Sequence, residues 1–289
     1  MAEPPDVAGG ALDRGGPRRG RRPDRPVTAR AVYSRSPLTN RDFLRLLAPG
    51  GLIVRFQPIV AAPRQGRRIR AVECLTHGVA SSGYADAGVL FAEARYRGLE
   101  AEIDRACVST MFDALARRPV PFDLFLNVHP ETLRRDGGFA GFLALAAQRA
   151  TVASSRLTVE LLEFGREVVD AALRRGVDSL RALGVRIALD DFGTSPADDQ
   201  MLRFVAPDFA KVDGALIRGA RQPGDLRRRV AALVSRITAS GATPIAEGLE
   251  VEADAVAVAE LGIPLAQGHL LGRPVGLETL ALAVPEEAR

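Results

Sequence analysis

Short apolar runs alternate with longer segments of helical period from about Leu38 to the end of the chain. The apolar runs lie at 52–57, 69–75, 122–127, 156–161, 185–190, 209–213, 243–248 and 264–268. Strands separated by helices predict a parallel sheet with crossover connections. Eight such runs fit one closed barrel better than an open sheet. The expected fold class is therefore α/β, a TIM-like (β/α)8 barrel.

Amphipathic helices are expected between several of these runs, where apolar side chains recur at the spacing of one helix face. Four such segments cover 99–118, 165–183, 225–240 and 251–262. In a β/α barrel, helices of this kind form the layer outside the strands. The barrel domain is expected to cover residues 36–289.

Residues 1–35 depart from this pattern, because they are rich in Gly, Pro and Arg and cannot bury a core. A disordered basic tail is predicted there. Its eight arginines and four acids account for the whole formal net charge of +4, so the barrel is close to neutral. Such a tail can touch an acidic membrane surface or nucleic acid. A solvated tail is the simpler interpretation, and no specific nucleic-acid binding is expected.

The remaining composition points to an intracellular protein. No apolar run reaches membrane-spanning length, and no apolar stretch follows the N-terminal arginines as a signal peptide would require. The two cysteines, Cys74 and Cys107, show neither metal-binding nor redox spacing. We therefore expect a cytoplasmic protein with reduced thiols and no transmembrane segment.

Each predicted strand carries a polar or charged side chain at or near its C-terminal end. These residues are Gln57, Glu73, Asn127, Glu160, Asp190, Lys211, Glu247 and Gln267. Because all C-terminal strand ends of a β/α barrel meet at the face that holds the active site, we expect a ring of acids around one point. Carboxylate and amide oxygens suit Mg²⁺ or Mn²⁺, whereas zinc sites usually recruit cysteine or clustered histidines.

Two adjacent acids and a solitary lysine sharpen this picture. Unpaired burial of Asp190 or Asp191 would be costly, but Asp190 could bridge two metal ions while Asp191 binds the second. Ions in such sites lie about 3.5–4 Å apart and activate a water for in-line attack at phosphorus. Lys211 is the only lysine in a chain with 39 basic residues. Its compact ammonium suits a place beside a metal-bound water better than the planar fork of arginine does.

A series of short motifs resembles the EAL domain family, the phosphodiesterases that open cyclic di-GMP. The motifs are FQPIV, AVECLTHG, LFLNVHP, VELLE, ALDDFGT, AKVDGALI, AEGLE and AQGHLLGRP, which occur in the family's order. They cover residues 38–280, nearly all of the chain after the tail. The resemblance implies a β/α barrel with a modified strand direction near its start.

The resemblance also implies a role for each site residue. The implied metal ligands are Glu73, Asn127, Glu160, Asp190 and Asp191, which together hold two ions. The implied catalytic residues are Lys211, which positions the attacking water, Glu247, which contacts the second metal or its water, and Glu163, which steadies the loop after the two aspartates. The implied substrate-binding residues are Gln57, Leu75, His77 and Gln267. The reaction would be metal-dependent hydrolysis of cyclic di-GMP to linear pGpG in bacterial second-messenger signalling.

Two departures from the family pattern affect this expectation. The signature normally continues to an arginine that binds a substrate phosphate, and His77 occupies that position; losing a charged hydrogen bond costs roughly tenfold to a hundredfold in affinity. The loop after the two aspartates normally reads Gly-Tyr-Ser-Ser but here reads SPADDQ, residues 195–200. We expect Asp198 and Asp199 to be solvated loop carboxylates or the start of a helix. Cys74 replaces a small alanine, and His129 and His269 are expected to be structural.

Three functions therefore remain open. The complete ligand set and Lys211 favour an active phosphodiesterase. His77 and the altered loop favour a catalytically degenerate EAL module that acts as a cyclic di-GMP sensor or as a protein-interaction partner. An unrelated barrel enzyme acting on another phosphate ester is the third alternative. Dimers are common in the family, so a homodimer and a regulatory protein partner are among the expected assemblies.

Overall fold

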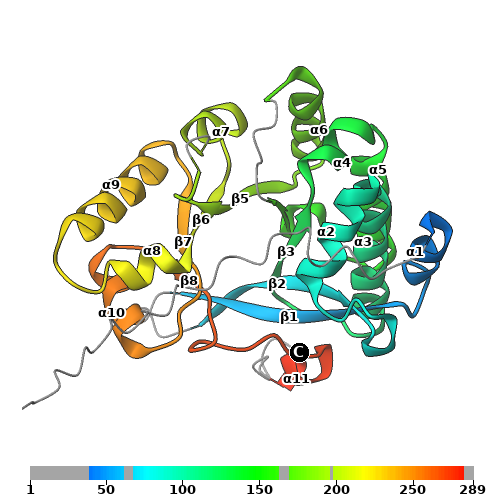
Figure 1. The fold of residues 1–289 in the computed structure, drawn as a ribbon, viewed down its shortest axis with the longest axis horizontal. Coiled ribbons are helices and arrows are strands. Elements are labelled where there is room, and N and C mark those ends of the chain that lie inside the picture. The colour runs from blue at the N-terminus through cyan, green and yellow to red at the C-terminus, as the bar shows by residue number, and fades with distance from the viewer. Residues whose placement is uncertain (1–38, 62–67, 163–168, 196–197, 283–289) are drawn as a thin grey trace, which may run out of the picture. The chain divides into compact units, whose positions relative to one another are not determined.

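The computed structural model describes residues 39–61, 68–162, 169–195 and 198–282, which form one closed barrel of strands with helices around it (Figure 1). The strands are β1 Leu52–Ala61, β2 Ile69–Gly78, β3 Asp123–Val128, β4 Leu157–Leu161, β5 Arg186–Phe192, β6 Phe209–Val212, β7 Thr243–Ala246 and β8 Leu265–Ala266. Each coincides with one predicted apolar run, and the barrel order follows the chain from β1 to β8. The predicted fold class is thus confirmed. The predicted tail, residues 1–35, lies outside the described residues.

Strand β1 runs against both of its neighbours, whereas all other neighbours in the barrel are parallel. Leu52 pairs with Gly78 of β2, and Val60 pairs with Ala266 of β8. A parallel connection needs roughly a dozen residues or more, and too few separate Ala61 from Ile69. The short connection therefore forces an antiparallel pair, and the modified strand direction near the start is confirmed.

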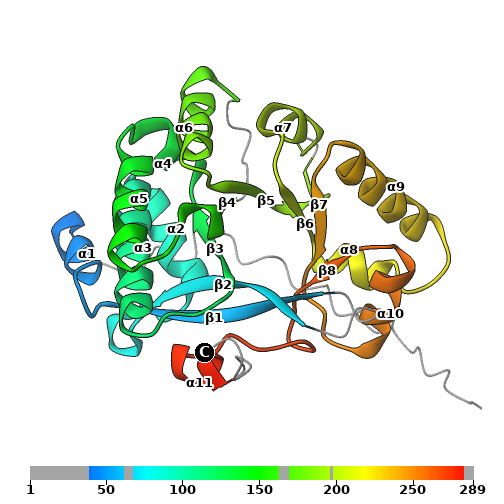
Figure 2. The same cartoon turned by 180° about the vertical axis from the view of Figure 1, so that it is seen from behind.

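The helices lie outside the strands, as the amphipathic patterns predict (Figures 1 and 2). They are α1 Asn40–Leu46, α2 Ala87–Arg97, α3 Glu100–Arg117, α4 Pro130–Arg135, α5 Phe139–Arg149, α6 Ala171–Ala182, α7 Asp198–Val205, α8 Gly214–Gly219, α9 Asp225–Ala239, α10 Glu252–Glu260 and α11 Leu277–Leu282. The four predicted helices correspond to α3, α6, α9 and α10. Helix α6 begins later than expected, because the Asp170 side chain caps it by accepting the N–H of Leu173.

The inside of the barrel is filled at one level by a small apolar cluster, which we call the barrel floor. It consists of the buried residues Ile59, Ala71, Phe125, Ala188 and Ile245. A separate and larger core fills the space between the strands and the surrounding helices. The floor excludes water from one end of the barrel interior, so groups that lie immediately above it are only partly solvated.

Asp254 ties helix α10 to the end of helix α8. Its buried carboxylate accepts hydrogen bonds from Arg221 Nε at 2.6 Å and from the backbone N–H groups of Glu250 and Val251 at 2.9 and 3.1 Å. Burial acts to raise the pKa of Asp254, but the bond from Arg221 and the two backbone bonds outweigh it and hold the pKa below its usual range. The ionised carboxylate therefore stabilises the folded chain.

We expect Asp254→Ala to lower the free energy of unfolding by about 1.5–3 kcal/mol at pH 7, because hydrogen bonds to a charged group are lost. The folded pKa lies below the unfolded value of about 3.9. The difference from wild type should therefore be full above that value and shrink as the pH falls through the folded pKa. Urea denaturation between pH 7 and pH 3 measures it. The exposed Asp225→Ala variant serves as control, and a difference independent of pH would contradict the assignment.

Candidate active site

Five of the eight polar residues predicted at the strand ends lie two positions along the chain from a residue of the barrel floor. Asn127 and Glu247 each follow a floor residue of their own strand by two positions. Side chains two residues apart on a strand point to the same face. On β1 the order is reversed, so Gln57 precedes Ile59 by two positions. Gln57 and Glu73 consequently lie within long strands, not at strand ends as their sequence runs suggested.

Lys211 on β6 lies at the centre of this polar layer, and its side chain is 2% exposed. Its Nζ lies 2.6 Å from Glu247 Oε1, 2.9 Å from Glu160 Oε2, 3.2 Å from Asp190 Oδ1 and 3.3 Å from Glu73 Oε2. Burial acts to lower the pKa of Lys211, but the four carboxylates outweigh burial and raise it well above its usual range. The ammonium therefore stays charged in the barrel interior.

Three amide side chains complete the layer. Gln267 Nε2 donates to Glu73 Oε2 at 2.7 Å and to Gln57 Oε1 at 3.0 Å, and Gln57 Nε2 donates to the carbonyl of Gly272 at 3.1 Å. Asn127 Nδ2 donates to Glu73 Oε1 at 2.9 Å. All eight polar residues predicted at the strand ends are thus joined through hydrogen bonds or ion pairs. Their functional roles remain predictions.

The layer holds more negative charge than one ammonium can balance. Burial, followed by the charge of Glu73, raises the pKa of Glu160 well above its usual range. Burial also raises the pKa of Glu247 to about 8. At Glu73 burial acts in the same direction, but the charge of Lys211 and the bonds from Asn127 and Gln267 hold its pKa below the usual value. Repulsion from neighbouring carboxylates adds to the effect of burial at Glu160 and Glu247, and a bound cation would relieve it.

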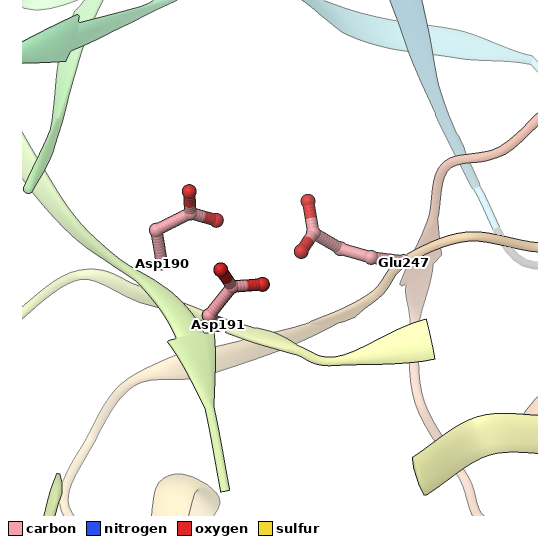
Figure 3. A group of neighbouring side chains, drawn as sticks. All are labelled: Asp190, Asp191 and Glu247. Carbon is pink, nitrogen blue, oxygen red and sulfur yellow. The ribbon is translucent and has the colours of Figure 1, made fainter. Parts of the chain in front are cut away.

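Asp190, Asp191 and Glu247 form the part of the layer that best suits a metal ion. One carboxylate oxygen from each lies within 4.8 Å of the others, and Figure 3 shows the three carboxylates facing one another. Nearby, Glu160 Oε1 and Asn127 Oδ1 are buried without a hydrogen-bond partner. Oxygen donors in this number and variety fit Mg²⁺, Mn²⁺ or Ca²⁺.

A bulge in β5 explains how two adjacent aspartates can face the same place. In a regular strand Asp190 and Asp191 would point to opposite faces. Here Leu189 pairs with Ala210 and Phe192 with Val212, so the register shifts between them. Asp191 adopts a positive φ of 47°, a left-handed conformation that aspartate tolerates better than most residues. The extra residue turns the Asp191 carboxylate back toward that of Asp190.

The turn after Asp191 is held by side chains of the altered loop. Thr194 Oγ1 donates to the carbonyl of Asp191 at 2.8 Å. The Asp198 carboxylate accepts the N–H groups of Gly193 at 2.6 Å and Ser195 at 3.1 Å. Asp198 and Asp199 do begin helix α7, but Asp198 is not the solvated loop carboxylate that was one expectation. No pattern in the sequence predicts this bond, because it depends on the conformation of a loop that departs from the family motif.

The rim beside the layer is formed by the strands β1 and β2. His77 is partly buried; its Nδ1 lies 2.9 Å from the carbonyl of Gly78, and its Nε2 accepts a hydrogen bond from Arg55 Nε at 3.3 Å. Leu75 lines a small cavity with Asn127 and Phe91. Sequence reasoning overlooked Arg55, although its two-residue spacing from Gln57 places both on one face of β1. The predicted residue Glu163 lies outside the described residues.

His129 has a structural place, in line with the expectation for it. Its side chain is 2% exposed, its Nδ1 lies 2.8 Å from Asp104 Oδ1, and its backbone N–H donates to Asp104 Oδ2 at 2.9 Å. Thr132 Oγ1 donates to the same carboxylate at 2.6 Å. The cluster fixes the start of α4 against α3 and so supports the strand that carries Asn127.

Comparison with known proteins places the chain in a family. A model of the EAL domain matches residues 40–274, and the chain therefore belongs to the EAL domain family. It is 29% identical over 253 residues to the bifunctional diguanylate cyclase/cyclic di-GMP phosphodiesterase MucR of Pseudomonas aeruginosa, over 84% of this chain and 36% of that protein. The structure of the PaMucR phosphodiesterase in complex with c-di-GMP superimposes with a TM-score of 0.70 at 26% identity, covering 80% of this chain and 99% of that one.

A second structure, Klebsiella pneumoniae BlrP1 with calcium and cyclic di-GMP, has a TM-score of 0.68 at 26% identity and covers 78% of this chain and 56% of that one. The chain spans well under two thirds of the curated relatives it matches: 36% of the length of MucR and 41% of the phosphodiesterase RocR of Pseudomonas aeruginosa. None of the described helices combines the length and hydrophobicity needed to cross a lipid bilayer.

We expect Asp198→Ala to lower the free energy of unfolding by about 1–2 kcal/mol, because two backbone donors lose their acceptor. Asp198→Asn should cost less, since burial raises the pKa of Asp198 and so disfavours its charge, while the amide keeps one oxygen acceptor. The matched control is Asp199→Ala, which removes the neighbouring, more exposed acid and its 3.3 Å pair with Arg236. Chemical denaturation compares the three variants. Equal stability of the two alanine variants would show that Asp198 does not hold the turn.

Proposed function

We propose that this chain hydrolyses one phosphodiester bond of cyclic di-GMP to give linear pGpG in the presence of divalent cations, as part of bacterial second-messenger signalling. The observation that carries the proposal is the layer of oxygen donors around Lys211, found in a chain of the EAL domain family. The relatives MucR and RocR are named as cyclic di-GMP phosphodiesterases. The PaMucR and BlrP1 structures were solved with cyclic di-GMP bound.

The oxygen donors of the layer are proposed to hold two divalent ions. Glu73, Asn127, Glu160 and Asp190 would hold one, and Asp190 with Asp191 the other. When bound, such ions polarise a phosphoryl group and lower the pKa of a bound water. Complexes of BlrP1 with calcium and with manganese are consistent with a hard cation at this place. The partnerless oxygens of Glu160 and Asn127 support the same assignment, because buried acceptors normally have a donor or a cation.

The other residues of the layer would bind and orient the reactants. Lys211 Nζ, which faces four carboxylates, is placed to donate to a water between them and to hold its orientation. Gln57, Gln267, Leu75 and His77 line the nucleotide side of the layer. Glu247 is placed beside Asp191 and would contact the second ion or its water. The role of Glu163, steadying the loop after Asp191, is part of the same proposal.

A second candidate function is a module that binds cyclic di-GMP, or a protein partner, without cleaving the nucleotide. The specific observation that favours it is His77, which stands where the family has an arginine and whose Nε2 is already engaged by Arg55. Against it stands the complete set of donors in the layer. Loss of catalysis would relax the selection that keeps so many buried carboxylates together.

Purified protein with Mg²⁺ or Mn²⁺ should release linear pGpG, and Lys211→Ala should lower the rate at least a hundredfold, a typical loss on removal of one preorganised donor. Product is measured by chromatography. Lys211→Arg is the matched control for charge, and we expect it to be nearly as inactive, because a planar guanidinium does not replace a compact ammonium among four carboxylates. Circular dichroism and nucleotide binding in Ca²⁺ show whether each variant is folded.

The outcomes separate the candidate functions. Tight binding of intact cyclic di-GMP without product would select the sensor module, and neither binding nor product would select the protein-partner module. Equal rates for wild type and Lys211→Ala would remove Lys211 from the mechanism.

Metal uptake gives an independent prediction. Asp191→Asn should weaken Mn²⁺ binding by about tenfold or more, because a neutral amide replaces a charged ligand in a site whose carboxylates repel one another. Calorimetry without nucleotide measures it. The exposed acid Asp178, on the outer helix α6, provides the control variant Asp178→Asn. Unchanged Mn²⁺ affinity in Asp191→Asn would contradict the ligand role.

A further inference from the structure

Arg55 is a cation on the site side of the barrel to which the family motifs assign no role. It precedes Gln57 by two positions on β1, so its side chain leaves the strand on the same face as Gln57. Its cross-strand partner is Leu75 of β2, and that pair is the next step of the ladder after Gln57 and Glu73. Arg55 therefore lies directly above the polar layer, on its open side.

Arg55 is exposed, and its guanidinium makes few hydrogen bonds. Within the described part of the chain, its only hydrogen bond is the one from Nε to His77 Nε2 at 3.3 Å, and no ion pair joins it to a described carboxylate. The other ring nitrogen of His77, Nδ1, lies 2.9 Å from the carbonyl of Gly78, so the ring is held between that carbonyl and the guanidinium. His77 thus holds one side of the fork and leaves the terminal nitrogens available.

An anionic substrate needs a positively charged side chain near the acidic layer, because the layer itself carries excess negative charge. The layer holds five carboxylates against the single ammonium of Lys211, an excess of four negative charges when all are ionised: Glu73, Glu160, Asp190, Asp191 and Glu247. Two divalent cations would cancel the resulting excess but leave no net positive charge for a dinucleotide with two phosphates. Arginine binds phosphate through paired hydrogen bonds from its planar fork. Arg55 is the exposed arginine that stands one ladder step from the layer.

We propose that Arg55 binds a phosphate of the cyclic dinucleotide, with its guanidinium positioned by His77. The terminal nitrogens of the fork donate to nonbridging phosphate oxygens, while Nε keeps its bond to His77. His77 is in this arrangement a positioning residue and not itself the phosphate ligand. Arg55 on β1 thus supplies the positive charge that the family's arginine would supply at position 77 of β2. This inference rests on the proposed function, because it assigns a further contact to the same substrate.

Affinity for cyclic di-GMP in Ca²⁺ tests the proposal with little interference from turnover. Arg55→Ala should weaken binding about tenfold to a hundredfold, raise KM by a similar factor, and leave the midpoint of thermal unfolding near the wild-type value. The affinity of Arg55→Lys should lie between those of wild type and Arg55→Ala, because lysine keeps the charge but not the planar fork of donors. The matched control is Arg70→Ala, which removes an exposed arginine of β2 that lies on the far side of the floor residue Ala71 from Glu73 and the polar layer.

A rescue experiment separates a phosphate contact from a merely structural effect. If positions 55 and 77 serve the same phosphate, then His77→Arg should restore most of the affinity lost in Arg55→Ala. In the wild-type background the same substitution should improve binding much less, because one fork already occupies the phosphate. The two substitutions would then be strongly non-additive in a double-mutant cycle.

The results also distinguish failure of this inference from failure of the proposed function. Wild type that binds and cleaves cyclic di-GMP while Arg55→Ala binds as well as Arg70→Ala would overturn the role of Arg55 alone. Additive effects of the two substitutions would overturn the shared phosphate. Wild type that neither binds nor cleaves the nucleotide would overturn both proposals together.

Discussion

The buried ammonium of Lys211 is the interaction on which the rest of the site depends. It faces four carboxylates, three on the strands β2, β4 and β5 and one just past the end of β7, at distances of 2.6–3.3 Å. Without a central positive charge, the repulsion among Glu73, Glu160 and Glu247 above an apolar floor would oppose closure of the barrel at this level. Yet one charge does not balance four. Burial raises the pKa values of Glu160 and Glu247, and the neighbouring carboxylates add to that rise. In the proposed function, divalent cations balance the charge that Lys211 leaves unbalanced.

Much of the fold and of the polar layer follows from two regularities in the sequence. The first is the set of eight apolar runs, which predict eight strands. The second is a polar residue two positions beyond an inward apolar one, as Asp190 is beyond Ala188, which predicts a side chain that faces the site. The reversal of β1 is less visible, because hydrophobic alternation reads the same in both directions. Its signal is the short connection before Ile69. Because periodicity alone does not reveal the reversal, it placed Gln57 and Glu73 at strand ends, whereas both lie within a long antiparallel pair of strands.

The bulge at Asp191 lies beyond what the sequence could predict. Two adjacent aspartates can share a site only if the strand departs from its two-residue alternation, and that departure depends on the register of β5 against β6 and on a positive φ. The family motif signals that the departure occurs, but not how this chain sustains it with Ser195 and Asp198 in place of the usual loop. Here the Asp198 carboxylate closes the turn by accepting the backbone N–H groups of Gly193 and Ser195.

The proposed role of Arg55 illustrates how a neighbouring strand can offset a single departure from a motif. A motif records one strand at a time, whereas a substrate phosphate meets whatever side chains the barrel places around it. His77 of β2 and Arg55 of β1 lie on consecutive antiparallel strands and are joined by a hydrogen bond across their ladder. Charge removed from one strand can therefore be supplied by its neighbour at little geometric cost. In the proposed function the acid layer takes up cations from solution, and the rim needs a cation from the chain. The pairing of β1 with β2 decides which strand can supply that cation.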